Sequence, residues 1–279
     1  MRIASPGHAV FAVTMIALGI IGLITGGFVG VWGGVPESMP SREALAYIGA
    51  VVALASGLGL LWQGTSAFAA RMLFVYLMLW LIVFKAPFIV RAPLVEGSYQ
   101  TTGETAAIVA GAWVLYAWLA PDWDRRRLSF ATGDNGVRFA RILYALALVA
   151  FGLSHFVYIE LTAPLVPPWL GWPVGWAYFT GAAYLAAGVA ILTGVLARLA
   201  AALTAVQMAS FTLLIWVPLV ASGPVGDFRF GEIVVNCVLT ASAWVVADSY
   251  RGTPWFAMLK RNDRELSVVR AFGADRGVD

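Results

Sequence analysis

The chain has 279 residues, of which 61% are hydrophobic and 12% are charged, and its formal net charge is +3. In soluble domains about half of the residues are apolar and about a quarter are charged, so this composition excludes a soluble globular enzyme. It also excludes a disordered chain, which needs low hydrophobicity. The composition is that of an integral membrane protein, in which excess positive charge governs orientation and does not indicate nucleic-acid binding.

Eight stretches of the chain are long and apolar enough to cross a bilayer as helices. A spanning helix needs about 20 mostly apolar residues, and the candidates lie at roughly 8–31, 43–62, 67–90, 104–121, 137–159, 175–196, 198–220 and 231–248. None shows the strict alternation of a barrel strand. We therefore predict an all-α fold, a polytopic membrane helical bundle with eight transmembrane helices.

A polar segment between the fourth and fifth stretches divides the chain into halves of similar length. This segment, 122–136, carries three consecutive arginines. We predict a first four-helix unit at 1–121, a cytoplasmic linker at 122–136, a second four-helix unit at 137–250 and a cytoplasmic tail at 251–279.

The two halves resemble each other when the first is shifted by 131 residues. Under this shift Tyr47 meets Tyr178, Gly57 meets Gly188, and Pro87 meets Pro218. Because each half has an even number of spans, both halves insert in the same direction. The pattern predicts a parallel repeat, whose halves are related by a pseudo-two-fold axis along the membrane normal.

The basic residues lie mostly on one side of the predicted spans. Fourteen lysines and arginines fall on the side of the two termini, three fall on the other side (Arg42, Arg91 and Arg229), and Lys85 lies within a span. Cytoplasmic loops are enriched in lysine and arginine, so we predict that both termini are cytoplasmic. The loops rich in proline, glycine and tryptophan would then face outward, and the spans would contact membrane lipids.

The second half carries a pattern that is typical of a known family of membrane proteins. A glycine and a histidine near the end of one helix precede a proline-rich outer loop, and the next helix has an apolar stripe with glycines. The residues in this order are Gly152, His155, Pro164, Pro167, Pro168, Gly181 and Gly188. This stretch resembles the signature region of the DoxX/DoxD-like integral membrane proteins. The first half resembles the same four-helix unit more faintly, with Thr25 where His155 would align.

The resemblance implies a function associated with redox chemistry. Some members of the family resemble subunits of quinone-linked, sulfur-oxidising complexes. The resemblance therefore implies a subunit of a redox complex in a bacterial-type inner membrane, with quinone as a possible cofactor and other protein subunits as partners.

Two glutamates occupy similar places in the two halves. Glu104 and Glu232 each stand near the predicted start of the fourth span of their half, and Asn236 follows Glu232 by one turn on the same helix face. One interpretation is a carboxylate stabilised by the helix dipole and wetted by headgroups. The other is a carboxylate pair lining a central outer cavity, with Glu232 as a catalytic candidate and Glu104 and Asn236 as ligand-binding candidates.

Two basic residues have no counterpart in the opposite half. His155 either hydrogen-bonds a backbone carbonyl or a headgroup, or acts as a catalytic residue that exchanges protons with a quinone oxygen, since histidine titrates near neutral pH. Lys85, which aligns with Trp216, either extends toward the headgroups or pairs with one of the glutamates to bind ligand. Because His155 and Lys85 each occur in only one half of the repeated scaffold, the pattern predicts one site rather than two.

Trp169 and Trp172 lie in the proline-rich outer loop. Tryptophan is enriched at membrane interfaces, and the chain contains 12 of them, so an interfacial belt explains both residues. Alternatively, they roof a hydrophobic site and bind its ligand.

The sequence contains no pattern that indicates a metal or haem site within this chain. It lacks the spacings of zinc and nucleotide-binding motifs. Its two histidines, His8 and His155, belong to opposite ends of parallel spans, so they lie at depths too different to share one haem. We therefore expect no metal or haem site built from this chain alone.

Three hypotheses about function remain open. The leading one is a redox-complex subunit, with or without oxidoreductase activity of its own, that handles quinone or another lipophilic substrate at its outer side. The second is a non-catalytic scaffold that anchors partner subunits. The third, favoured by the repeat and by the intramembrane charges, is a small-molecule transporter.

Overall fold

Each apolar stretch forms a long helical segment in the structure, a computed structural model that describes residues 3–28, 32–222 and 227–257. The segments are α1 (Pro6–Thr25), α2 (Arg42–Leu61), α3 and its continuation (Ser66–Arg91), α5 (Glu96–Leu119), α7 (Gly133–Val157), α9 (Pro173–Thr193), α10 and its continuation (Ala197–Ala221) and α12 (Asp227–Asp248). Within the described residues every element is helical, and seven segments are long and apolar enough to span a membrane. The predicted all-α polytopic membrane fold is confirmed.

Helix α5 accounts for the difference between eight predicted spans and seven. The prediction placed this span at 104–121, but α5 runs from Glu96 to Leu119 and begins with a polar stretch. It packs against α3, α7 and α12, and most of its later residues are buried. Because neighbouring helices cover α5, it tolerates polar residues that a lipid-facing helix would not.

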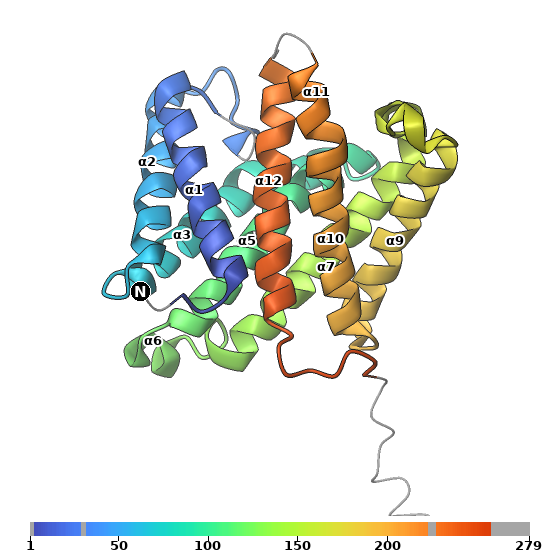
Figure 1. Ribbon diagram of the computed structural model, residues 1–279. Helices are drawn as coiled ribbons and strands as arrows, with labels where there is room; N and C mark the ends of the chain where they lie inside the picture. Colours follow the sequence, from blue (N-terminus) through green and yellow to red (C-terminus); the bar gives the residue numbers. More distant parts are fainter. Residues whose placement is uncertain (1–2, 29–31, 223–226, 258–279) are drawn as a thin grey trace, which may run out of the picture.

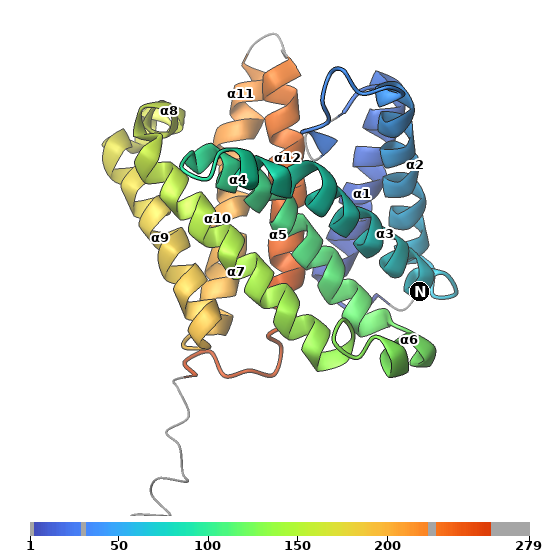
Figure 2. The same cartoon turned by 180° about the vertical axis from the view of Figure 1, so that it is seen from behind.

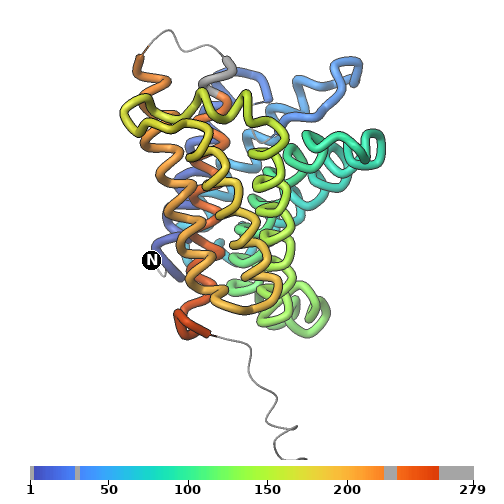
Figure 3. Tube along the Cα trace, turned by 90° about the vertical axis from the view of Figure 1, so that its right-hand side faces the viewer, coloured from blue at the N-terminus to red at the C-terminus, as the bar shows by residue number. Residues whose placement is uncertain are grey.

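The long helices pack in a closed ring that follows the order of the chain. Each contacts the next in the sequence α1, α2, α3, α5, α7, α9, α10 and α12, and α12 returns to α1. Helices α5 and α12 also pack against each other across the ring. Figures 1 and 2 show α12 and α5 near the middle of the bundle in opposite views, and Figure 3, seen from the right-hand side of Figure 1, has α9 and α10 in front.

Packing within the first half recurs in the second. The contacts of α1 with α2, of α2 with α3 and of α3 with α5 correspond to those of α7 with α9, of α9 with α10 and of α10 with α12. The same four-helix arrangement therefore occurs twice, as the 131-residue repeat predicts. The domain boundaries drawn from the sequence stay a prediction.

The third helix of each half widens into a π-helical turn at the same position. In the first half α3 (Ser66–Trp80) continues through η2 (Leu81–Lys85) into α4 (Ala86–Arg91). In the second half α10 (Ala197–Phe211) continues through η5 (Thr212–Trp216) into α11 (Val217–Ala221), so the two turns lie 131 residues apart. A proline follows each turn at the second position, Pro87 and Pro218. Proline lacks an N–H and its ring collides with the carbonyl four residues earlier, and a wider turn accommodates both effects.

Glycines allow the first two helices of each half to approach closely. A Cβ atom on Gly57 of α2 would lie 2.8 Å from the backbone oxygen of Ala12 in α1. A Cβ atom on Gly188 of α9 would lie 2.9 Å from the backbone oxygen of Ala145 in α7. In a membrane, small residues drive helix association by letting backbones pack tightly, so these aligned glycines set the same contact in both halves.

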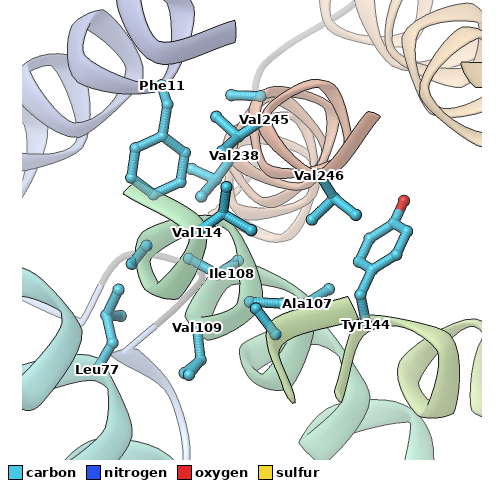
Figure 4. Packing of buried hydrophobic residues seen from close by; sticks show 14 of the residues in the cluster. Phe11, Leu77, Ala107, Ile108, Val109, Val114, Tyr144, Val238, Val245 and Val246 are labelled. Carbon is cyan, nitrogen blue, oxygen red and sulfur yellow. The ribbon is translucent and has the colours of Figure 1, made fainter. Parts of the chain in front are cut away.

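Apolar side chains from four helices fill the middle of the ring. Figure 4 shows Phe11 of α1, Ile108 and Val114 of α5, Tyr144 of α7 and Val238 of α12 in this core. All five are fully buried. The core therefore joins the two halves to each other and is not confined to either one.

Buried aspartates connect separate segments of the chain by hydrogen bonds at one end of the bundle. Asp124 of α6 (Asp122–Arg127) is fully buried and accepts hydrogen bonds from Arg71 Nη1 at 3.2 Å and from Tyr116 Oη at 3.0 Å. Asp248, at the end of α12, accepts a hydrogen bond from the backbone N–H of Gly7 at 2.9 Å. Figure 1 shows the start of α1, α6 and the last turn of α12 at this same end.

The opposite end carries the short helices of the proline-rich loop. They are α8 (Ile159–Thr162), η3 (Ala163–Leu165) and η4 (Pro168–Leu170). Figure 2 shows α8 at the end away from α6. The two ends of the bundle therefore carry different short helices, α6 at one end and α8, η3 and η4 at the other.

Candidate functional site

Three ionisable side chains from both halves meet inside the bundle. Lys85, the last residue of η2, is 4% exposed, while Glu104 of α5 and Glu232 of α12 are partly buried. Glu104 interacts electrostatically with both Lys85 and Glu232, and Gln100, one turn earlier in α5, hydrogen-bonds the Glu104 carboxylate. We refer to Lys85, Glu104 and Glu232 as the central cluster.

The π-helical turn fixes the position of Lys85. The hydroxyl of Thr102 in α5 shares its proton between the backbone oxygens of Ser98, at 2.7 Å, and Lys85, at 3.1 Å. Gly34 also lies near the Lys85 side chain. A Cβ atom added to Gly34 would lie 3.5 Å from the Lys85 Cδ atom. The widened turn thus joins η2 to α5 and places the lysine beside Glu104.

The two glutamates lie at different distances from the starts of their helices. Glu104 lies two turns inside α5, which begins at Glu96, and Glu232 lies in the second turn of α12, which begins at Asp227. The placement of Glu104 at the start of a helix was therefore wrong, because α5 extends eight residues further than the apolar stretch. The electrostatic interaction between Glu104 and Glu232 agrees with the alternative, a carboxylate pair at the contact of the two halves.

Lys85 and Asn236 have different surroundings. Lys85 is buried and interacts electrostatically with Glu104, although among the described residues no ion pair within 4.0 Å joins them. Asn236 is half-buried, and its side-chain amide donates a hydrogen bond to the backbone oxygen of Glu232 at 3.1 Å. Its amide N–H group is thus engaged within α12 itself.

His155 belongs to a separate aromatic group in the second half. Its Nδ1 atom lies 2.8 Å from the backbone oxygen of Phe151, so its ring stays within hydrogen-bonding distance of its own helix. The ring packs against Tyr184 of α9 and Phe211 of α10, with centroid distances of 5.5 and 6.2 Å. Among the described residues, no hydrogen bond, ion pair or electrostatic interaction joins His155 to Glu232. The structure therefore does not bring the two predicted catalytic residues together.

Trp169 and Trp172 lie on the surface of the proline-rich loop. They are 71% and 79% exposed. The ring of Trp172 packs against Gly175 at the start of α9. This exposure fits the interfacial belt better than a roof over a buried ligand.

Sequence reasoning missed an aromatic group in the first half. Trp32, Tyr76 and Trp80 form a triangle whose ring centroids are 5.2 to 5.8 Å apart. Trp32 and Trp80 are 1% and 3% exposed. Within the described protein the Trp32 Nε1, Tyr76 Oη and Trp80 Nε1 atoms are buried without a hydrogen-bond partner. The i, i+4 spacing of Tyr76 and Trp80, which places them on one face, was the available signal.

Comparison with known proteins supplies no relative. No protein-family model matches this chain, and neither does any curated protein or solved structure. Across the described residues no group of three histidine, cysteine, aspartate or glutamate side chains is placed to hold a metal ion. The resemblance to the DoxX/DoxD-like proteins therefore stays a prediction, and the candidate site rests on its own geometry.

Proposed function

We propose that the protein is a membrane subunit of a redox complex that binds quinone, or another lipophilic carbonyl compound, near its outer side. The central cluster is the observation that supports this proposal. Ionisable groups inside a membrane are costly and usually mark a site of ligand binding or proton movement. Here one lysine and two glutamates lie between the halves, where α5 packs against α12.

The cluster suits a ligand that gains and loses protons. Reduction of a quinone to a quinol takes up protons as well as electrons, and a carboxyl group beside an ammonium group can supply or accept a proton. Glu104 and Glu232 would exchange protons, and Lys85 would stabilise the negative charge that develops on the ligand. The electrons would come from a redox partner subunit, as the resemblance to DoxX/DoxD-like proteins implies.

Localisation is part of the same proposal. The excess of basic residues at the end that holds α6 supports cytoplasmic termini in a bacterial-type inner membrane. Lys85 ends the π-helical turn late in the third helix of the first half. The central cluster would then lie toward the outer half of the bilayer.

Purification from the native membrane tests the proposal. We expect quinone to be extracted with the full chain at a constant molar ratio, and Lys85→Met and Glu104→Gln to lower that ratio severalfold. Glu160→Gln changes an exposed glutamate of α8 and serves as the control. A stoichiometric protein complex that contains no quinone would contradict the proposal and favour the hypothesis of a non-catalytic scaffold.

A further inference from the structure

Aligned positions on the third helix of each half carry polar or aromatic side chains, but only in the second half does the polar side chain have a hydrogen-bond partner. Under the 131-residue shift Tyr76 and Trp80 of α3 correspond to Gln207 and Phe211 of α10. In the second half Gln207 Nε2 donates to the backbone oxygen of Thr180 at 3.1 Å, and Gln207 also hydrogen-bonds Tyr184.

In the first half the corresponding groups lack partners. The indole N–H groups of Trp32 and Trp80 and the hydroxyl of Tyr76 are buried without a hydrogen bond in the described protein. A buried donor without a partner costs free energy comparable to a lost hydrogen bond. Three such groups in one triangle therefore indicate a molecule that is not part of this chain.

The chemistry of the three groups defines that molecule. An indole N–H only donates, and a tyrosine hydroxyl donates readily, so the ligand must present acceptor oxygens. Aromatic rings surround the donors, since Phe28 and Phe84 lie 5.7 and 4.6 Å from the ring of Trp80. Flat, apolar molecules stack on such rings. A planar lipophilic compound with carbonyl oxygens meets both requirements.

A hollow on the surface of the bundle lies near this group. It is lined by Gly26, Gly27, Phe28, Arg42, Glu43 and Ala46. Phe28 belongs both to this hollow and to the surroundings of Trp80, since the two rings lie 5.7 Å apart. Phe28 therefore stands between the hollow and the triangle.

We propose that Trp32, Tyr76 and Trp80 form the binding site for a planar lipophilic carbonyl compound, with their N–H and O–H groups donating to its oxygens. This inference rests on the proposed function and adds the position of the ligand. The site belongs to the first half alone, whereas sequence reasoning centred it on His155 in the second half.

Binding of menadione, a naphthoquinone, to the full chain in phosphatidylcholine nanodiscs tests this assignment. Trp32→Phe, Tyr76→Phe and Trp80→Phe each remove one donor and keep an aromatic ring. We expect each variant to bind about three- to tenfold more weakly than the unchanged protein, as loss of one hydrogen bond predicts. Tyr184→Phe in the second half is the matched control, and its affinity should not change.

The outcomes separate this inference from the proposed function. Menadione binding that is unaffected by all three substitutions, or weakened by Tyr184→Phe instead, would overturn the site and leave the proposed function standing. Absence of menadione binding to the unchanged protein would overturn both. The melting temperature of Tyr76→Phe serves as a second readout, because this change removes only the unpaired hydroxyl and should leave the melting temperature the same or higher, whereas the two Trp→Phe changes also leave a cavity. A lower melting temperature of Tyr76→Phe would mean that the hydroxyl serves the fold, and this would contradict the assignment.

Discussion

Lys85 and Trp216 occupy the same position in the two halves, each as the last residue of a π-helical turn. Both are buried, at 4% and 7% exposure. One position of a repeated backbone therefore holds an ammonium group in the first half and an indole in the second. The candidate site is asymmetric because a few side chains differ, while the helices that carry them pack alike.

Lys85 and Glu104 should depend on each other energetically. Lys85→Met removes the ammonium group that interacts with Glu104, and we expect it to lower the free energy of unfolding by about 1–3 kcal/mol. In the double variant Lys85→Met, Glu104→Gln, part of this loss should be recovered, with a coupling energy of about 0.5 kcal/mol or more. Unfolding of the four proteins in mixed detergent micelles measures the cycle. The same cycle with Glu160→Gln, at an exposed position, should be additive, and equal coupling in both cycles would contradict a specific pair.

Each π-helical turn should be stabilised by a threonine from the fourth helix of its half. Thr102→Val removes the hydroxyl that donates to the Lys85 backbone oxygen, and Thr240→Val removes the hydroxyl 3.1 Å from Thr212 Oγ1. We expect each change to cost about 1 kcal/mol, measured by thermal melting in detergent. Thr102→Val alone should also weaken quinone binding, since only the first turn carries Lys85. Weaker binding in Thr240→Val to the same extent would indicate a general loss of structure.

Aligned glycines should be equally intolerant of a methyl group. Gly57→Ala and Gly188→Ala would place a Cβ atom within 3 Å of a backbone oxygen on the facing helix. Overpacking of this kind costs about 1–3 kcal/mol. Gly231→Ala is the control, because a Cβ there would have no atom within 4 Å. The melting temperature should fall in Gly57→Ala and Gly188→Ala and stay unchanged in Gly231→Ala.

Asp124 should be important for stability at the end that holds α6. Asp124→Ala removes the acceptor of Arg71 and leaves the hydroxyl of the buried Tyr116 unpaired. We expect a loss of about 2–3 kcal/mol in unfolding free energy. Asp122→Ala, an exposed neighbour in the same helix, should change it by less than about 0.5 kcal/mol. Similar losses in both variants would show that the buried contacts of Asp124 contribute little.

Topology follows from the distribution of arginine and lysine. A reporter fused after Asp279 should read as cytoplasmic, and one inserted at Leu94, which is 98% exposed in the loop before α5, should read as extracytoplasmic. Two reporters on the same side would contradict an arrangement in which α5 crosses the membrane.

Much of the fold could be predicted because apolar length alone identifies a spanning helix. The start of α5 could not, since its Gly97, Ser98 and Gly103 are typical of a loop. Tertiary contacts override this preference: a Cβ on Gly103 would already touch Ala150 of α7 at 3.4 Å. These glycines therefore serve close packing, which a single sequence does not distinguish from a turn.

The candidate site could be predicted only in part, for a similar reason. Lys85 and Glu104 stand out because charge is rare in a membrane helix. Trp32 and Trp80 do not, because tryptophan is ordinary at the interface. Their significance lies in the missing hydrogen-bond partners. Whether a buried donor has a partner depends on three-dimensional packing and cannot be predicted from the spacing of residues in the sequence.

The polar first turns of α5 have a consequence for how the protein is made. Seven helical segments are apolar enough to partition into lipid by themselves, but α5 is not among them. Its polar residues are covered by α3 and α7, its neighbours on either side in the chain. We expect α5 to wait at the insertion machinery until α7 has been synthesised, and to enter the bilayer with it as a hairpin. Chains that end before Gly133 should then leave α5 outside the membrane.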